Sequence, residues 1–408
     1  MQNKKLKVAV FTGNRAEFGL QLPILREIKK NKKMDYYLVV SGAHLDSDFG
    51  NTLKEIKKKG FVIHKKVKIN MDAKNLKSNV TAIGSGVLSI SKAFIELKPD
   101  IVLVYADRFE GFAAVIASTQ LNIPTAHIEG GDITEGGALD DSVRHAMTKL
   151  SHLHFTTNEQ ATNRILAMGE ERWRVHTVGF PALDLIKKRS FATINEIKEK
   201  FKFDFSNPII LFTQHSVTTR YKETKKQIKE SIKALQKLSS LNYNIIITYP
   251  NNDAGGSIIL DQYNKLIKKK NTNIFIFKSL GQYYYHGILS LAKYKSYKVI
   301  CVGNSSSGIK ETPIFNCPTI NIGTRQDGRL RGDNVLDVDY KSTEIIKAIK
   351  YSLNNQKFIK KCSNTPNPYY IGNAGKKIVK ILLKIKINQK LITKKMQNKG
   401  LVRNGWYK

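Results

Sequence analysis

Residues 101–129 have the sequence IVLVYADRFEGFAAVIASTQLNIPTAHIE, and this stretch decides the fold class. It starts with a strand-sized apolar run, Ile101–Ala106, continues with a helical pattern, and ends in a second apolar run, Pro124–Glu129. Two such runs joined by a helical pattern predict a strand–helix–strand unit. Nearly continuous apolar strands are expected where helices cover both faces of a parallel sheet.

The same pattern recurs on both sides of this unit and predicts two doubly wound, Rossmann-like α/β domains. We expect domains at residues 1–180 and 181–365, with a Lys-rich helix Leu183–Phe201 opening the second. Residues 366–408 follow, with a helix at Ala374–Asn388 that is a candidate for crossing back to the first domain and a basic tail beyond it. The further expected strands are Lys7–Thr12, Tyr36–Ser41, Phe61–Val67, His152–Thr156, Val175–Gly179, Pro208–Gln214, Asn244–Pro250, Asn273–Lys278, Lys298–Gly303, Thr319–Gly323 and Val335–Val338.

Composition limits the class of protein. The 408 residues include 68 Lys and Arg against 33 Asp and Glu, a net charge of +35. The excess is mostly lysine spread along the whole chain, so we predict no nucleic-acid partner; a basic protein that binds nucleic acid or an anionic membrane is the distant alternative. The longest uncharged apolar runs are strand-sized, which predicts no stable membrane insertion. Three scattered cysteines and no signal-peptide pattern predict a cytoplasmic protein.

Charged residues follow the expected strands of the first half. Open parallel sheets bind ligands at the carboxyl ends of their strands, so these residues are the candidates for chemistry. Asp107 and Arg108 end one strand, either for function or as an internal structural pair, and Asp140 or Asp141 is expected to cap a helix. If Asp107, Glu129 and Asp141 converge, their repulsion would supply an acid beside a base, as proton transfer at carbon requires. Arg15, at a helix start, suits an anion.

The second half of the chain contains a pattern that is typical of a phosphate-binding site. The segment GNSSSGIKE, residues 303–311, offers helix-start N–H groups and serine hydroxyls to a diphosphate, and Glu311 could accept from sugar hydroxyls; a serine-rich helix cap is the alternative. His215, Asn251 and Arg325 also follow strands. Glycine motifs for dinucleotides or nucleoside triphosphates do not occur, and His152 with His154 has no third ligand at metal spacing. We therefore predict no cofactor and no metal.

Nine ordered segments together resemble the hydrolysing UDP-N-acetylglucosamine 2-epimerases, from about Val8 to Gly375. The resemblance implies a glycosyltransferase-B-like fold with a UDP-sugar in the cleft between two domains, no metal or nicotinamide, and a homo-oligomer. It implies elimination of UDP to give a 2-acetamidoglycal, followed by hydration with inversion at C2. The segments are GNRAEFG, SGAHLDSDFGNT, ADRFE, HIEGGD, DDSVRHAMTKLSH, QHSVTT, PNNDAGG, GNSSSGIKE and GTRQDGR.

Matching these motifs residue by residue implies roles. Asp107, Glu129 and His215 would serve the proton transfers, with Asp141 and His44 in the sugar pocket. The residues that would hold UDP are Arg15, Arg108, His215, Asn251, Ser305, Ser306, Glu311 and Arg325.

Three departures from the family pattern bear on the substrate. Asn14 replaces the usual Thr or Ser, and Ala106 replaces a Gly, which adds a methyl group. The stretch Asp132–Leu139 is about two residues longer than usual and adds Glu135 beside the expected sugar site. The substrate that the resemblance implies is therefore UDP-N-acetylglucosamine or, alternatively, UDP-N,N'-diacetylbacillosamine on the route to legionaminic acid. A glycosyltransferase on the same fold is a further alternative that would need an acceptor sugar.

Overall fold

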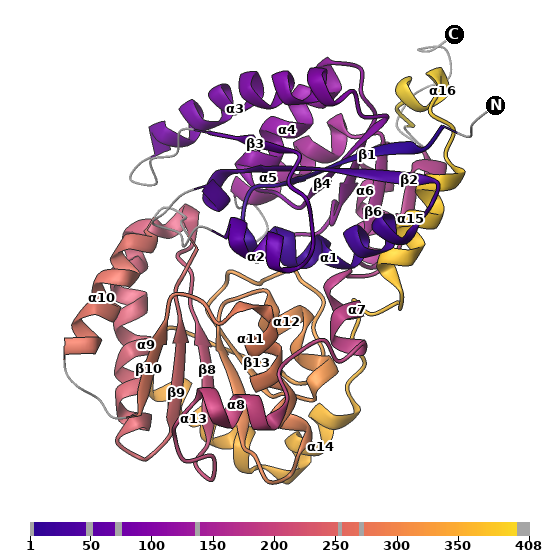
Figure 1. Cartoon of the computed structure of the whole chain (residues 1–408). Coiled ribbons are helices and arrows are strands. Elements are labelled where there is room, and N and C mark those ends of the chain that lie inside the picture. The colour runs from indigo at the N-terminus through magenta and orange to yellow at the C-terminus, as the bar shows by residue number, and fades with distance from the viewer. Residues whose placement is uncertain are drawn as a thin grey trace, which may run out of the picture. The chain divides into compact units, whose positions relative to one another are not determined.

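The computed structural model describes residues 4–45, 52–69, 76–134, 139–251, 255–268 and 273–397. The chain divides into two compact units (Figure 1). Unit 1 comprises the chain up to Ile133, Leu139–Asp184 and the chain from Tyr369 onward, and unit 2 is built mainly from Leu185–Pro368. The two units are described separately below.

Unit 1 contains a parallel sheet in the order β3-β2-β1-β4-β5-β6-β7. Its middle strands are apolar and fully buried, as β4 is along its whole length. Helices α3, α4 and α5 lie on one side of this sheet and α1, α2 and α15 on the other (Figure 1). The strands are β1 (Leu6–Thr12), β2 (Met34–Ser41), β3 (Lys65–Val67), β4 (Ile101–Tyr105), β5 (Thr125–Ile128), β6 (Leu153–Thr156) and β7 (Val175–Thr177).

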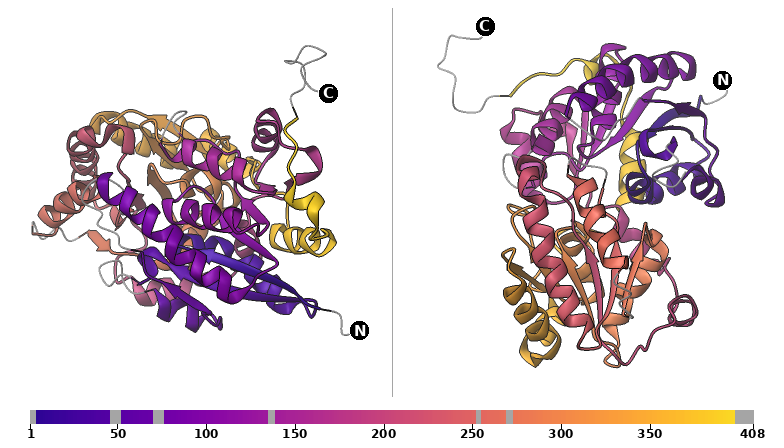
Figure 2. Two further views of the ribbon diagram at one scale, coloured as in Figure 1. Left: turned by 90° about the horizontal axis from the view of Figure 1, so that it is seen from above. Right: turned by 90° about the vertical axis from the view of Figure 1, so that its left-hand side faces the viewer.

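Unit 2 repeats this winding in a parallel sheet of order β10-β9-β8-β11-β12-β13. Its core joins the buried faces of β8, β9 and β11 to helices α9, α10 and α13. Helices α8 and α11 contact each other. The right-hand view of Figure 2 shows helices on both sides of this sheet. The strands are β8 (Ile209–Thr213), β9 (Asn244–Thr248), β10 (Ile274–Phe277), β11 (Val299–Gly303), β12 (Thr319–Ile322) and β13 (Val335–Val338). Every strand expected from the sequence is present, which confirms two Rossmann-like α/β domains.

The helices follow the strands as the winding requires. Those of unit 1 are α1 (Arg15–Lys30), α2 (Leu53–Lys58), α3 (Leu76–Leu97), α4 (Phe109–Gln120), α5 (Leu139–Leu150), α6 (Glu159–Ala167), α15 (Ala374–Lys384) and α16 (Gln389–Ile392), with α7 (Ala182–Lys187) at the unit boundary. Those of unit 2 are α8 (Ile194–Lys200), α9 (Thr224–Ser239), α10 (Gly256–Lys268), α11 (Gly281–Ser290), α12 (Ser307–Lys310), α13 (Ser342–Asn354) and α14 (Gln356–Asn364). Short 3-10 helices are η1 (Gly42–Leu45), η2 (Arg172–Arg174), η3 (Thr218–Glu223), η4 (Leu291–Lys293) and η5 (Thr312–Phe315).

The expectation of one helix over Leu183–Phe201 is wrong. The segment forms α7 and α8, separated at Arg189, which has a left-handed φ of 50°. Thr193 then starts α8 with a capping box, in which its hydroxyl accepts from the Glu196 N–H while the Glu196 carboxylate accepts from the Thr193 N–H. This local pairing competes with helix continuation and explains the break.

The C-terminal segment packs back onto unit 1. Helix α15 lies against α1, where Gly375 comes so close to Pro23 that a Cβ would stand 2.9 Å from its carbonyl carbon. The Asp184 carboxylate accepts from the N–H groups of Ala374 and Gly375, at 3.1 and 2.9 Å, and so caps α15. The buried Arg174 then donates to the carbonyls of Lys390, Leu391 and Thr393.

Helix α3 is longer and more apolar than expected from the strand-sized apolar runs of the sequence. Its window Val80–Leu97 is long and apolar enough to cross a membrane by length and composition, and 28% of that window is buried. One face of α3 packs into the unit 1 core through Ala82, Ile90 and Phe94. A single helix of this kind is weak evidence for a membrane span.

Candidate active site

Asp107 and Asp141 are joined by a buried arginine. Arg144, fully buried on α5, forms ion pairs with Asp107, just after β4, and with Asp141, whose Oδ1 lies 2.9 Å from its Nη1. The same nitrogen donates to the carbonyl of Asp132 at 2.8 Å. The expected repulsion between the two aspartates is therefore replaced by attraction to a shared cation. Asp141 also lies within the first turn of α5, after Leu139, so the expectation that Asp140 or Asp141 caps this helix is wrong.

Glu129 follows the neighbouring strand at the same edge. Tyr105 pairs with Ile128 in the β4–β5 register, so the residues that follow these two strands lie side by side. Glu129 is 6% exposed, and both it and Ala106 have left-handed φ values, of 65° and 54°. The expectation that Ala106 adds only a methyl group is incomplete, because glycine adopts this conformation freely and alanine does not. Strained backbone at strand ends is common at functional sites.

Arg108 forms an ion pair with Glu110. Its Nε lies 3.5 Å from Oε2 of Glu110, a residue with no exposed surface at the start of α4. A second buried acid, Glu17 on α1, accepts from the Gly13 N–H at 2.7 Å. Burial, followed by the charge of Glu110, raises the pKa of Glu17 to about 8. The edge of unit 1 thus carries a protonated acid beside an arginine.

The structure gives less support to His44 and Arg15 as ligands of the substrate. The Nε2 of His44 contacts the Thr12 hydroxyl at 3.0 Å, and its Nδ1 contacts the Thr52 hydroxyl at 2.5 Å, with the ring fully buried. Direct contact of His44 with a sugar would require one of these bonds to break. Arg15 begins α1, and its side chain lies outside the described atoms.

In unit 2, Asn304 organises the residues around His215. The His215 N–H donates to the Asn304 side-chain oxygen at 2.7 Å, and the Asn304 amide donates back to the His215 carbonyl at 2.9 Å. The Asn251 N–H donates to Nδ1 of His215 at 3.0 Å, which places the proton of a neutral ring on Nε2. His215 is 7% exposed, whereas Asn251 is exposed.

The serine segment and Arg325 lie at the same sheet edge. Gly303 ends β11 with a φ of 131°, and a Cβ there would collide with the carbonyl of Thr213 on the neighbouring strand. Arg325, after β12, donates to the Asn304 carbonyl at 3.1 Å. Ser305 and Ser306 are half-buried and precede α12, which is a single turn rather than a long helix.

Glu311 directly follows that turn. Its Oε2 receives hydrogen bonds from His286 Nε2 at 3.0 Å and from the Ser307 hydroxyl at 2.7 Å. Among the residues predicted from the sequence, the structure thus brings together Asp107 with Asp141, and His215 with Asn251 and Arg325. The position of Glu135 lies outside the described residues.

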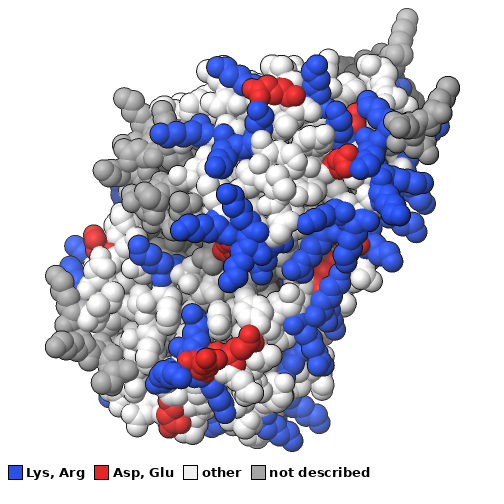
Figure 3. All heavy atoms as spheres, viewed as in Figure 1, with Lys and Arg blue, Asp and Glu red and all other residues white. Residues whose placement is uncertain are grey.

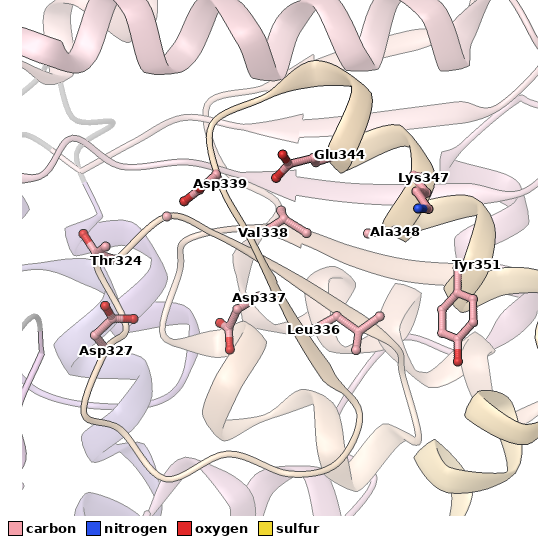
Figure 4. Close-up of a pocket in the computed structure, with 11 residues that line it drawn as sticks. Thr324, Asp327, Leu336, Asp337, Val338, Asp339, Glu344, Lys347, Ala348 and Tyr351 are labelled. Carbon is pink, nitrogen blue, oxygen red and sulfur yellow. The ribbon is translucent and has the colours of Figure 1, made fainter.

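A surface pocket of about 660 Å³ in unit 2 does not suit a nucleotide. It lies between β12, β13 and α13 and is lined by acidic side chains together with a single lysine (Figure 4). Negative lining repels a diphosphate, and Arg331 already pairs with two of those acids. The acids are Asp327, Asp337, Asp339 and Glu344.

Five structurally prominent residues were missed as individual sites by the sequence analysis, namely Glu17, Glu110, Arg144, His286 and Asn304. Four of them, all but His286, lie inside the quoted motifs. The signal that could have found Arg144 is its position one helical turn after Asp141. Among the described residues, no group of three or more His, Cys, Asp and Glu could hold a metal ion. His154 instead pairs with Glu170, and His152 accepts from the Thr125 N–H.

This fold and these residues define a class of sugar-nucleotide enzyme. The family model described as UDP-N-acetylglucosamine 2-epimerase matches residues 26–383. The chain belongs to this family, whose members include hydrolysing UDP-sugar 2-epimerases, and the resemblance drawn from its motifs is confirmed.

Individual relatives act on two related sugars. A GDP/UDP-N,N'-diacetylbacillosamine 2-epimerase (hydrolyzing) of Campylobacter jejuni is 35% identical over 82% of this chain and 84% of its own. The UDP-N,N'-diacetylbacillosamine 2-epimerase (hydrolyzing) of Legionella pneumophila is 33% identical over 95% and 98%. A UDP-N-acetylglucosamine 2-epimerase of Neisseria meningitidis is 34% identical over 86% and 89%.

Solved structures show the same fold. The UDP-GlcNAc 2-epimerase of Neisseria meningitidis bound to UDP-GlcNAc matches with a TM-score of 0.78 and 21% identity, covering 93% of this chain and all of that one.

Proposed function

We propose that the protein hydrolyses UDP-N-acetylglucosamine to UDP and N-acetylmannosamine. In the first step a base takes the C2 proton, the C1–C2 double bond forms, and the C1–O bond breaks with its electron pair leaving on UDP. In the second step water adds across the double bond, with OH at C1 and a proton at C2 on the opposite face. The sum is substrate plus water giving UDP plus the C2-inverted sugar, with no oxidant or reductant.

The proton transfers are assigned to Asp107 and Glu129, with His215 and Asp141 in support. The observation that carries the proposal is the pair Asp107 and Glu129 at adjoining strand ends, with Arg144 compensating the charge of Asp107. Two acids at one sheet edge can serve as base and acid for proton transfer at one carbon. The residues that we propose to bind UDP are Arg15, Arg108, His215, Asn251, Ser305, Ser306, Glu311 and Arg325.

A direct test follows UDP release and sugar identity by NMR in D2O. The proposal expects one deuterium at C2 of the product, because the proton that returns there comes from solvent or an exchanging acid. Asp107→Asn and Glu129→Gln should each abolish UDP release while circular dichroism stays native. Asp35→Asn, at an exposed ion pair, is the control and should retain full activity. Full activity of either site variant would disprove the catalytic assignment.

UDP-N,N'-diacetylbacillosamine is the second candidate substrate, giving 2,4-diacetamido-2,4,6-trideoxymannose by the same steps. The names of the Campylobacter and Legionella relatives favour it, at identities close to that of the Neisseria enzyme. Separate incubations with each UDP-sugar decide between them. Turnover of the second alone would place the enzyme on the legionaminic acid route, and turnover of the first alone on the sialic acid route.

The protein is also proposed to self-associate through α3. Its solvent face carries Val80, Leu88 and Ile95, which are 72%, 68% and 55% exposed, and at Gly84 an added Cβ would meet open space. Large and small residues alternate along this stripe, with Ser91 between Leu88 and Ile95. An antiparallel second copy centred between residues 87 and 88 would set Val80 against Ile95 and Gly84 against Ser91. A two-fold interface requires such self-complementarity.

We also propose that the protein is cytoplasmic and has no nucleic-acid partner. All three cysteines are buried and unpaired, which is compatible with a cytoplasmic protein. The surface in Figure 3 carries many lysines and arginines and few acids, which attracts anionic substrates as well as nucleic acids. Retention on DNA at 150 mM salt, if found, would contradict the proposed absence of a nucleic-acid partner.

A further inference from the structure

Glu311 has two inequivalent carboxylate oxygens. Oε2 is held by two donors from different elements, His286 of α11 and Ser307 of α12. Oε1 makes no hydrogen bond within the described part of the chain, and it is not among the fully buried unpaired atoms there. Because Oε1 has no partner there and is not fully buried, part of the residue's 7% exposure lies on this oxygen.

The imidazole of His286 is fixed in place. The residue is 1% exposed, and its ring packs against Phe315 with centroids 5.6 Å apart. Because a carboxylate only accepts, Nε2 carries the proton and donates to it. Nδ1 is buried and has no hydrogen-bond partner among the described residues.

An unpaired buried nitrogen costs about 1–3 kcal/mol, which an apolar side chain of similar size would avoid. Packing alone therefore does not account for a histidine here, whereas its bond to Glu311 does.

This arrangement keeps Glu311 ionised. Burial by itself would raise the pKa of the carboxyl, but His286, through charge and hydrogen bond, and the Ser307 hydroxyl hold the pKa below its ordinary value. An ionised carboxylate with one free oxygen is an acceptor for sugar hydroxyls.

We infer that His286 is a positioning residue, which orients Glu311 so that Oε1 is presented to the ribose hydroxyls of the bound nucleotide. The inference rests on the proposed function, because it takes Glu311 as a ligand of UDP. His286 does not touch the substrate in this scheme; it acts through the carboxylate that it holds.

The test compares binding of UDP and of 2',3'-dideoxy-UDP by calorimetry on the full chain. In His286→Leu, UDP binding is expected to weaken about tenfold, because a charge-assisted hydrogen bond contributes roughly that much. Binding of the dideoxy nucleotide should stay within twofold of wild type, because it lacks the hydroxyls that Glu311 would accept from. His286→Gln, which can still donate, should recover most of the loss.

Three further measurements separate positioning from stability. In turnover, KM should rise in His286→Leu while kcat changes little. In a Glu311→Gln background, His286→Leu should cause no further loss of UDP binding. His176→Leu in unit 1 is the control and should bind UDP like wild type. His176 is half-buried, and like His286 it has one buried ring nitrogen without a hydrogen-bond partner among the described residues.

Each remaining outcome decides the matter. Equal weakening of both nucleotides, or no weakening of either, would overturn the role of His286 while leaving the proposed function intact. If His286→Leu does not fold, the UDP-to-dideoxy ratio in His286→Met, which likewise lacks a donor, carries the same test. Failure of the wild-type protein to bind UDP would overturn the proposed function first, and the inference with it.

Discussion

The guanidinium of Arg144 is ion-paired with the carboxylate of Asp107, although one residue lies on α5 and the other follows β4. Arg144 has no exposed surface, and Asp141 is its second carboxylate partner. A buried cation between two acids holds the end of β4 and the first turn of α5 in a fixed relation. Removing it leaves negative charges without compensation in a site of low polarity.

Arg144→Met is therefore expected to lower the free energy of unfolding by about 3–5 kcal/mol. Urea unfolding measures this, and Arg144→Met combined with Asp141→Asn should lose less than the single variant. Arg331→Met is the matched control, because its partners Asp327 and Asp337 are about half exposed and a surface pair contributes about 0–1 kcal/mol. Equal losses for Arg144→Met and Arg331→Met would contradict the role given to Arg144.

Glu17 predicts a pH dependence of stability. Its pKa is about 8 in the folded protein against an ordinary value of 4.5, so the folded state holds a proton that the unfolded state releases between these values. Stability from this group is fully present below pH 4.5 and is lost as pH rises towards 8, at up to about 1.4 kcal/mol per pH unit.

Glu17→Gln should remove that loss, because the amide resembles the protonated acid. We expect the free energy of unfolding of Glu17→Gln, relative to that of the wild type, to be higher at pH 8 than at pH 5. The exposed control Glu199→Gln should show the same pH dependence as the wild type. If the free energy of unfolding varies with pH in the same way in wild type and Glu17→Gln, then Glu17 is not the protonated acid.

The left-handed backbone of Ala106 predicts that a glycine at this position does not destabilise the protein. At a φ of 54° an alanine costs about 1–2 kcal/mol, and glycine relieves this but adds freedom to the unfolded chain worth roughly 0.4–1 kcal/mol. Ala106→Gly should therefore leave the midpoint of thermal unfolding unchanged or raise it. Ala146→Gly, within α5, should lower it, because glycine costs about 1 kcal/mol in a helix interior. A similar drop in both variants would remove the case for strain at Ala106.

The α3 face predicts a specific cross-link. Leu88→Cys should form a disulfide-linked dimer under mild oxidation, because the proposed two-fold axis brings the two copies of residue 88 together. The native cysteines are buried, so the background should be low. Val62→Cys, 63% exposed elsewhere on unit 1, should stay uncross-linked.

Light scattering gives a second readout, in which Leu88→Asp should lower the measured mass to that of a monomer. A wild-type monomer in solution would refute self-association through this face. Sedimentation of that monomer with liposomes would assign the face to a lipid surface instead.

Strand positions followed from the sequence because a strand buried on both faces needs an uninterrupted apolar run, as in Ile101–Tyr105. Helix ends followed less well, since the break before Thr193 depends on a capping box and a left-handed Arg189 that compete with helical periodicity. The candidates Asp107, Glu129 and His215 were found because carboxyl ends of parallel strands are where ligands bind.

The sequence by itself determined the two Rossmann-like domains, the family, and the candidate residues at the strand ends, because those depend on local periodicity and ordered motifs. Only the tertiary structure decided that Arg108 pairs with Glu110, that Arg144 links Asp107 to Asp141, and that His286 holds Glu311. The physical reason is that a buried charge takes the partner that strand register and helix packing bring within reach, and neighbours in sequence are not always that partner.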